Sequence, residues 1–197
     1  MVSLVADVRA VVEEVALGEP AIVGHSLGAS IAAVYAAAHG ARAVLCVDQS
    51  LRFGEFARLV QAHADALRSQ RTMEAVLSID RALKLKPYTG VEDIERRVLA
   101  FPREVVLGVW DALLSTPPEQ LTAIAEAILP RIAAPLLSLH GSPPAPDYAD
   151  WLAGLVRGAR VEIWDGTGHM LHLVDPEQFA ARVQPLFANH QRAEGSF

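Results

Sequence analysis

The stretch Ala21-Ile-Val-Gly-His-Ser-Leu-Gly28 joins an apolar run to an alanine-rich segment, residues 29–38. The apolar run predicts a buried strand, and the alanine-rich segment predicts a helix. Between them lies a Gly-x-Ser-x-Gly pattern made by Gly24, Ser26 and Gly28. Glycines on both sides of a serine permit the tight strand-to-helix turn that exposes a nucleophilic hydroxyl. Ser26 is therefore a candidate nucleophile.

Short apolar runs alternate with helical segments along most of the chain. We expect strands over residues 20–24, 42–47, 135–140 and 160–164, and helices over residues 3–17, 27–39, 147–156 and 176–188. This alternation is typical of a parallel sheet covered by helices on both faces. The predicted fold class is α/β, with a single domain over residues 1–197.

Residues 51–130 differ from the rest of the chain. They contain no convincing strand, several apolar stripes at helical spacing and several prolines. We expect a helical lid or cap inserted between two strands, over the end of the sheet where ligands bind. Ordinary crossover helices are the alternative, although the segment is long for one crossover.

Composition narrows the class of partner. The 197 residues are 52% hydrophobic and 20% charged, with a net charge of -6 and no basic cluster. We expect a small neutral substrate, with no nucleic acid as partner. Residues 21–47 are apolar enough to suggest a membrane span, but their glycines and polar side chains divide them into strand, turn and helix. The charged N-terminal segment is unlike a secretory leader, and Cys46 lies in an apolar run, so a cytoplasmic setting is expected.

A serine hydroxyl needs a base. Among the seven histidines we choose His169, because Asp165-Gly-Thr-Gly-His-Met170 follows the last predicted strand and has glycines on the same loop. His172 is expected to orient this loop. The helix that begins at Leu27 directs free amides at the same point, which suits an oxyanion. No His, Asp or Glu cluster has the spacing of metal ligands, so neither a metal nor a cofactor is expected.

The GHSLG turn after a strand, the order of serine before histidine, the lid and the ending GTGHMLHLVDPEQF together resemble the α/β-hydrolase superfamily. The resemblance covers essentially the whole chain. It implies an esterase-like serine hydrolase in which Ser26 attacks, His169 is the base and the Leu27 amide binds the oxyanion. Gly24, His25 and Gly28 then complete the nucleophile elbow.

The acid of the triad is displaced in this chain. The resemblance places it at position 144, which is Pro144 here. Asp48 follows the strand after the nucleophile helix, where haloalkane dehalogenases of the same superfamily carry their acid. Neighbouring strand ends lie about 5 Å apart, so a carboxylate there can reach an imidazole from the last strand. Asp147, in the loop after the prolines, is the second candidate, and the absence of an acid is the third.

The chain lacks the first strands that the superfamily usually has, together with the His-Gly-rich loop that supplies half of the oxyanion hole. We therefore expect a truncated fold with the strand of Ser26 at the sheet edge. A buried parallel strand does not tolerate an open edge. Three explanations stay open: the reading frame continues upstream, another chain supplies the strands, or the protein is a shortened and weakly active variant that forms a homodimer through this edge.

The function expected from these residues is hydrolysis of a small apolar carboxylic ester, or a related acyl compound, through an acyl-enzyme. Two alternatives stay open. One is an acyltransferase or a cofactor-free perhydrolase that uses the same triad. The other is a catalytically weak or inactive binding protein or scaffold.

Overall fold

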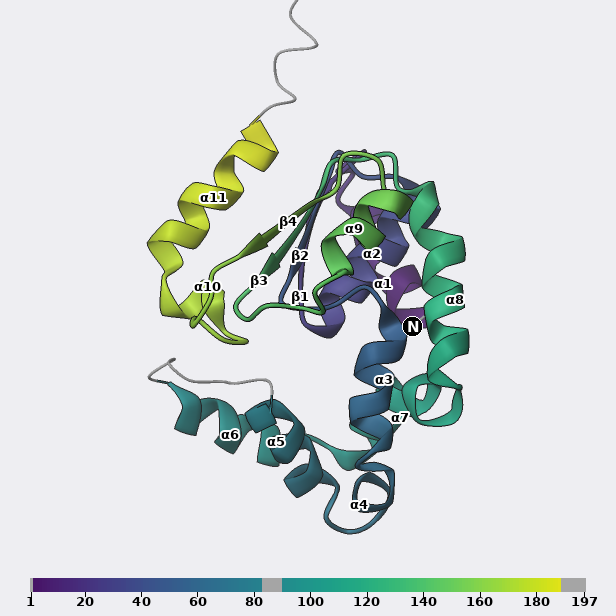
Figure 1. Cartoon of the computed structure of the whole chain (residues 1–197), viewed down its shortest axis with the longest axis vertical. Helices are drawn as coiled ribbons and strands as arrows, with labels where there is room; N and C mark the ends of the chain where they lie inside the picture. The colour runs from purple at the N-terminus through teal and green to yellow at the C-terminus, as the bar shows by residue number, and fades with distance from the viewer. Residues whose placement is uncertain (1, 83–89, 189–197) are drawn as a thin grey trace, which may run out of the picture.

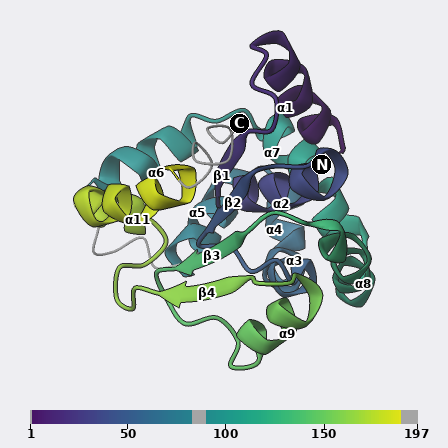
Figure 2. The ribbon, with the colours of Figure 1, turned by 90° about the horizontal axis from the view of Figure 1, so that it is seen from above.

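Four parallel strands form the centre of the molecule in the computed structural model, which describes residues 2–82 and 90–188. They are β1 (Ala21–His25), β2 (Ala43–Val47), β3 (Leu136–His140) and β4 (Arg160–Ile163), and they lie in the order β1-β2-β3-β4. The α/β class and the edge position of the strand before Ser26 are thus confirmed for the described residues. Figure 2 shows the four strands in this order, with helices on both sides.

Side chains along the two central strands alternate between two cores. In β2, Val44 and Cys46 belong to the core beneath α2 (Leu27–His39), while Leu45 and Val47 belong to the core beneath α11 (Pro176–Ala188). All five residues of β2 and all five of β3 are buried. A strand covered on both faces is apolar throughout, which explains the continuous apolar runs of the sequence.

The two outer strands are covered less completely than we expected. Val23 in β1 is 44% exposed and Ile163 in β4 is 45% exposed. Burial of both faces therefore holds for β2 and β3 only. The reason is geometric, because α11 lies against the middle of the sheet and leaves part of this face open at its edges.

The helices follow the expected order with shifted ends. The helix α1 (Val2–Glu14) ends three residues before the expected position, because Ala16 and Gly18 both take positive φ angles, of 53° and 62°. The helix α9 (Tyr148–Leu155) and α11 agree with expectation within one residue. Two short elements were not expected, namely α10 (Leu171–Val174) and the 3-10 helix η1 (Leu129–Arg131).

Helices fill the inserted segment between β2 and β3. They are α3 (Phe53–Gln61), α4 (Ala64–Arg68), α5 (Thr72–Ala82), α6 (Val91–Leu99), α7 (Arg103–Ser115) and α8 (Pro118–Ile128). Figure 1 shows α4 to α7 beyond the end of the sheet at which the strands finish. Residues 83–89 of the predicted lid lie outside the described residues. That this segment acts as a lid stays a prediction.

Within this inserted segment, α3 and α8 are in close backbone contact. A Cβ atom added at Gly54 of α3 would collide with the backbone carbonyl of Pro118 at the start of α8. The backbones of the two helices approach this closely only because Gly54 has no side chain.

None of the helices in the described ranges combines the length and the apolar character that a bilayer crossing requires.

Candidate active site

The turn at Ser26 has the strained backbone of a nucleophile elbow. Ser26 takes φ 55° and ψ -127° between β1 and α2, a conformation that disfavours residues with a side chain and that costs about 1–3 kcal/mol. A Cβ at Gly24 would collide with the Gly28 carbonyl, so Gly24 must be a glycine. A Cβ at Gly28 would meet no atom within 4 Å. The steric reason expected for both glycines therefore applies to Gly24 alone.

Backbone hydrogen bonds fix this turn beside the end of β2. The Ser26 amide donates to the carbonyl of Val47 over 2.9 Å, and the Ala29 amide donates to the carbonyl of Ser26 over 2.8 Å. The Leu27 amide opens α2 and has no partner that the helix itself can supply. Ser26 is half-buried. Within the described ranges, its hydroxyl makes no hydrogen bond to His169 or to another side chain.

Asp48 and His169 form a close pair. The Nδ1 of His169 lies 2.7 Å from Oδ2 of Asp48, and the other carboxylate oxygen of Asp48 accepts a 2.7 Å hydrogen bond from the Gly141 amide. The carboxylate can only accept, so Nδ1 carries the proton and Nε2 of the neutral ring is a free base. Burial alone would raise the pKa of Asp48, but the hydrogen bonds from His169 and Gly141 bring it below its ordinary value.

The loop of His169 lies directly against the loop that follows β3. The Gly168 amide donates to the Gly141 carbonyl over 3.0 Å. A Cβ at Gly141 would collide with the Gly168 carbonyl. Gly141 therefore contacts the loop of His169 and the carboxylate of Asp48 at the same time. Gly141 was not among the site residues expected from the sequence, although its place directly after a strand was a usable signal.

Asp147 lies elsewhere. Its carboxylate pairs with both terminal guanidinium nitrogens of Arg52, each over 3.2 Å, and its side chain is 72% exposed. This hydrogen bond from Arg52 lowers the pKa of Asp147. The structure thus brings Asp48, and not Asp147, beside His169.

Two further imidazoles lie next to this pair. The ring centre of His25 is 4.5 Å from that of His169 and 4.6 Å from that of His172. The sequence predicts that His172 orients the loop of His169, and this stays a prediction; its ring contacts those of His25 and, with ring centres 5.8 Å apart, Phe179. Among the described residues, no group of three or more His, Cys, Asp or Glu side chains has a geometry that could hold a metal ion.

Two cavities lie beside the proposed reacting groups. One, of about 200 Å³, is lined by polar and apolar residues: Asp48, Gln49, Ser50, Glu55, Phe56, Leu59 and His169. The other, of about 40 Å³, is mainly apolar and is lined by Leu27, Ser30, Gln49, Phe53, Phe56, Val109, Ala112, Leu113 and Leu121. Gln49 and Phe56 line both, so the two cavities are neighbours. Neither residue was expected from the sequence: the apolar pattern of α3 does not show that Phe56 meets a cavity, and Gln49 lies in the loop between β2 and α3.

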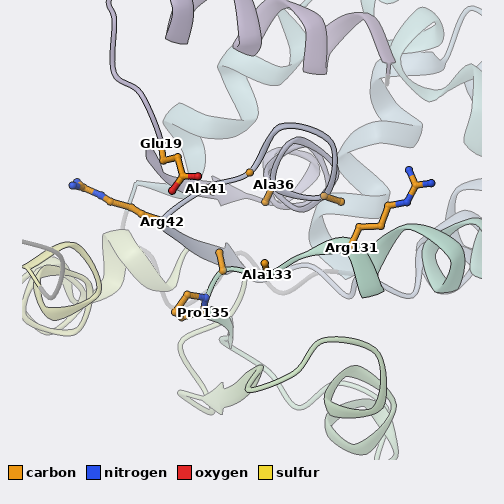
Figure 3. Close-up of a pocket in the computed structure, with 10 residues that line it drawn as sticks. Glu19, Ala36, Ala41, Arg42, Arg131, Ala133 and Pro135 are labelled. Carbon is orange, nitrogen blue, oxygen red and sulfur yellow. The ribbon is translucent and has the colours of Figure 1, made fainter. Parts of the chain in front are cut away.

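A third cavity, of about 310 Å³, lies at the opposite end of the sheet, where β2 and β3 begin (Figure 3). Arg42 and Arg131 line it, and the Nε of Arg42 is buried without a hydrogen-bond partner in the described part of the chain. Figure 3 shows these two side chains reaching in opposite directions. They do not converge on a common ligand.

A family model described as the alpha/beta hydrolase family matches residues 2–182. The chain therefore belongs to the alpha/beta hydrolase family, and its described residues form fewer strands than are usual in that fold. No match was found among curated proteins.

Solved structures share the fold at low sequence identity. A hydrolase from Pseudomonas aeruginosa is 20% identical with a TM-score of 0.70, over 94% of this chain and 71% of that chain. Est816, an N-acyl homoserine lactone degrading enzyme, is 20% identical with a TM-score of 0.71, over 92% and 72%. A structure from a study of the carboxylesterases of Nitrososphaera gargenis is 16% identical with a TM-score of 0.61, over 94% and 70%.

Proposed function

We propose that this chain is a serine hydrolase that cleaves carboxylic esters through Ser26, His169 and Asp48. The observation that carries the proposal is the 2.7 Å contact between His169 Nδ1 and Asp48 Oδ2, at a strand end that is hydrogen-bonded to the Ser26 amide. This arrangement supplies an oriented imidazole next to a strained elbow. Membership of the family supports hydrolysis in general, and the ester as substrate is the finer part of the proposal.

The proposed reaction has two acyl-transfer steps. Ser26 Oγ forms a bond to the ester carbonyl carbon while its proton passes to His169 Nε2, and the Leu27 amide donates to the oxyanion. When the tetrahedral species collapses, the carbon–alkoxide bond breaks and the imidazolium returns the proton to the leaving alcohol. Water then repeats the sequence on the acyl-enzyme, which releases the acid and restores Ser26. Asp48 holds the tautomer of His169 and stabilises its charged form.

In these steps Ser26 and His169 must form a hydrogen bond that the described residues do not show. Catalytic hydrogen bonds are often long in an empty site and shorten when the substrate binds. The backbone geometry supports such a closure, because Ser26 is held to the end of β2 at Val47 and Asp48, next along the chain, holds His169. The proposal requires that Ser26 Oγ and His169 Nε2 come within hydrogen-bond distance when the substrate binds.

The apolar cavity beside Leu27 supports a short acyl group. Its volume of about 40 Å³ is small beside the neighbouring cavity of about 200 Å³. We therefore propose acyl groups up to about butyryl, with the alcohol directed into the larger cavity near Glu55.

A serine-directed phosphonate probe tests the nucleophile. We expect labelling of the wild-type chain that is lost in Ser26→Ala and His169→Ala and retained in Ser115→Ala. Ser115 is an exposed serine of α7 whose hydroxyl contacts only the backbone of its own helix, so it is a matched control. Absence of labelling in the folded wild type would instead favour a binding or scaffold protein.

Ester chain length tests the acyl cavity. Val109 of α7 is half-buried and lines the cavity. We expect Val109→Phe to reduce kcat/KM for butyryl esters relative to acetyl esters by about 10-fold or more, and Val109→Ala to shift the preference towards longer acyl groups. The measurement is a p-nitrophenyl ester series from acetyl to octanoyl. A wild-type preference for octanoyl would contradict the assigned cavity.

A further inference from the structure

His25 connects the two segments that carry the proposed reacting groups. Its Nε2 lies 2.8 Å from the backbone carbonyl oxygen of His169, across 144 residues of sequence. A carbonyl can only accept, so Nε2–H of His25 is the donor. His25 is also the residue directly before Ser26. A single hydrogen bond therefore joins a position adjacent to the nucleophile with the base itself.

The ring of His25 is held in place by its neighbours. It contacts the rings of both His169 and His172, and His172 in turn contacts Phe179 of α11. Burial, followed by the proximity of His169, lowers the pKa of His25 to about 4. The ring is therefore neutral near pH 7, and with its one proton on Nε2 it remains a donor while His169 gains and loses charge.

The loop of His169 has further hydrogen bonds to other segments of the described chain. The Gly168 amide donates to the Gly141 carbonyl after β3, and the imidazole of His169 donates to Asp48, next to the residue that accepts from the Ser26 amide. The first bond holds the loop to the end of β3, and the second holds the imidazole itself. The hydrogen bond from His25 joins the backbone of His169 directly to the residue that precedes Ser26.

We propose that His25 is a positioning residue that, by donating to the His169 carbonyl, sets the distance between His169 Nε2 and the Ser26 hydroxyl. The inference rests on the proposed function, since it concerns the same nucleophile and base. His25 exchanges no proton with the substrate. Loss of its hydrogen bond lets the base loop move relative to the elbow, and a displacement of about 1 Å at such a position lowers turnover about 100-fold.

Substitutions at position 25 separate the hydrogen bond from the bulk of the ring. His25→Gln places an amide donor close to the position of Nε2, whereas His25→Leu retains apolar volume without a donor. With a short-chain p-nitrophenyl ester we expect His25→Leu to lower kcat about 10–100-fold with KM within about 2-fold, and His25→Gln to retain kcat within about 3-fold. His39→Leu, at an exposed histidine of α2, is the matched control and keeps wild-type kinetics.

The outcomes distinguish this inference from the function on which it rests. Ester hydrolysis that persists in Ser26→Ala refutes the proposed function. Hydrolysis that requires Ser26 but is equally fast in His25→Leu, or equally impaired in His25→Gln and His25→Leu, refutes the positioning role alone. If His25→Leu does not fold, His25→Asn replaces it, because its shorter amide falls short of the His169 carbonyl. Its activity must then be lower than that of His25→Gln.

Discussion

Asp48 has three properties that suit the acid proposed for the triad. Its φ angle of 48° turns the chain sharply at the end of β2, a conformation that aspartate tolerates better than most residues. Its two oxygens are separately occupied by Gly141 and His169, so the carboxylate has one defined orientation. Its side chain is 13% exposed, which strengthens both hydrogen bonds relative to those in water.

The two aspartates considered for this role allow a direct test. Asp48→Asn retains the size of the side chain but removes the negative charge that holds the His169 tautomer, and we expect kcat to fall about 100–10,000-fold. Asp147→Asn loses only an exposed ion pair with Arg52, and we expect kcat within about 2-fold of the wild type. The measurement is steady-state ester hydrolysis by both variants. The reverse order of activities would assign the acid to Asp147.

The buried neutral His25 gives stability a defined pH dependence. Its folded-state pKa of about 4 lies below the ordinary value of 6.5, so between these two pH values the unfolded chain binds a proton that the folded chain does not. The free energy of unfolding therefore falls as pH falls through this window, by about 3 kcal/mol at most from this group. The same sign applies to His140 and His172, whose pKa values burial also lowers.

A variant isolates the contribution of His25. We expect the wild type to lose about 1–3 kcal/mol more than His25→Gln between about pH 7 and about pH 4.5, because glutamine cannot bind the proton. His140, His172, His169 and Asp48 are present in both proteins, so their effects largely cancel in the difference. Urea unfolding of both proteins at the two pH values measures this difference in the free energy of unfolding. Parallel pH dependence of the two proteins would mean that His25 is not buried in its neutral form.

At the scale of elements, α3 connects the sheet to the inserted helices. It follows β2 closely, it packs against α7 and α8, and its residues Phe53 and Phe56 line the apolar cavity. The approach of α3 to α8 depends on Gly54, where a side chain would strike the backbone of Pro118. Any shift between these two helices changes the wall of that cavity.

Two glycines in helices of the insertion provide a matched pair. Gly54→Ala forces α3 and α8 apart, and we expect it to destabilise the fold by about 1–3 kcal/mol. Gly108 of α7 has no atom within 4 Å of an added Cβ. Gly108→Ala is therefore expected to stabilise the fold by about 0.5–1 kcal/mol, through helix propensity alone. Thermal unfolding of both variants shows whether each substitution raises or lowers Tm relative to the wild type. A higher Tm for Gly54→Ala than for Gly108→Ala would contradict the packing described for α3.

Local sequence patterns predicted the elements better than their ends and their mutual contacts. The elbow at Ser26 and the loop of His169 follow from glycine spacing and from the apolar runs before them. The early end of α1 depends on the positive φ of Ala16, and an alanine gives no signal of such a turn. The contacts of His25 with His169 and of Gly141 with Gly168 join distant segments. Such contacts can be predicted only when the order of the strands and the positions of the loops at the strand ends are known.

For the whole molecule, the open edge of the sheet is the main structural problem. Within the described residues, β1 pairs only with β2, so one side of its backbone has no strand partner. Val23 of β1 is 44% exposed, and Val11, Val15 and Leu17 before it are 55–60% exposed. An unpaired edge with neighbouring apolar surface favours association with another strand.

We propose that the chain of residues 1–197 self-associates through this edge. Light scattering should give a mass above that of one chain, increasing with protein concentration. Val23→Lys places a charge at the edge strand and should lower the apparent mass, as lysines do on natural sheet edges. Asp7→Asn, on the exposed face of α1, controls for the change in charge, because it raises the net charge by the same one unit. A strictly monomeric wild type at high concentration would refute this proposal.

The double role of Gly141 has a consequence for engineering. Its amide holds Asp48, and its carbonyl and bare Cα hold the loop of His169, so the turns that follow β3 and β4 form one mechanical unit. Grafting either turn alone from a related scaffold would misalign Asp48 and His169 relative to each other. A designer who wishes to alter the proposed site must transplant both turns as one cassette, with Gly141 retained.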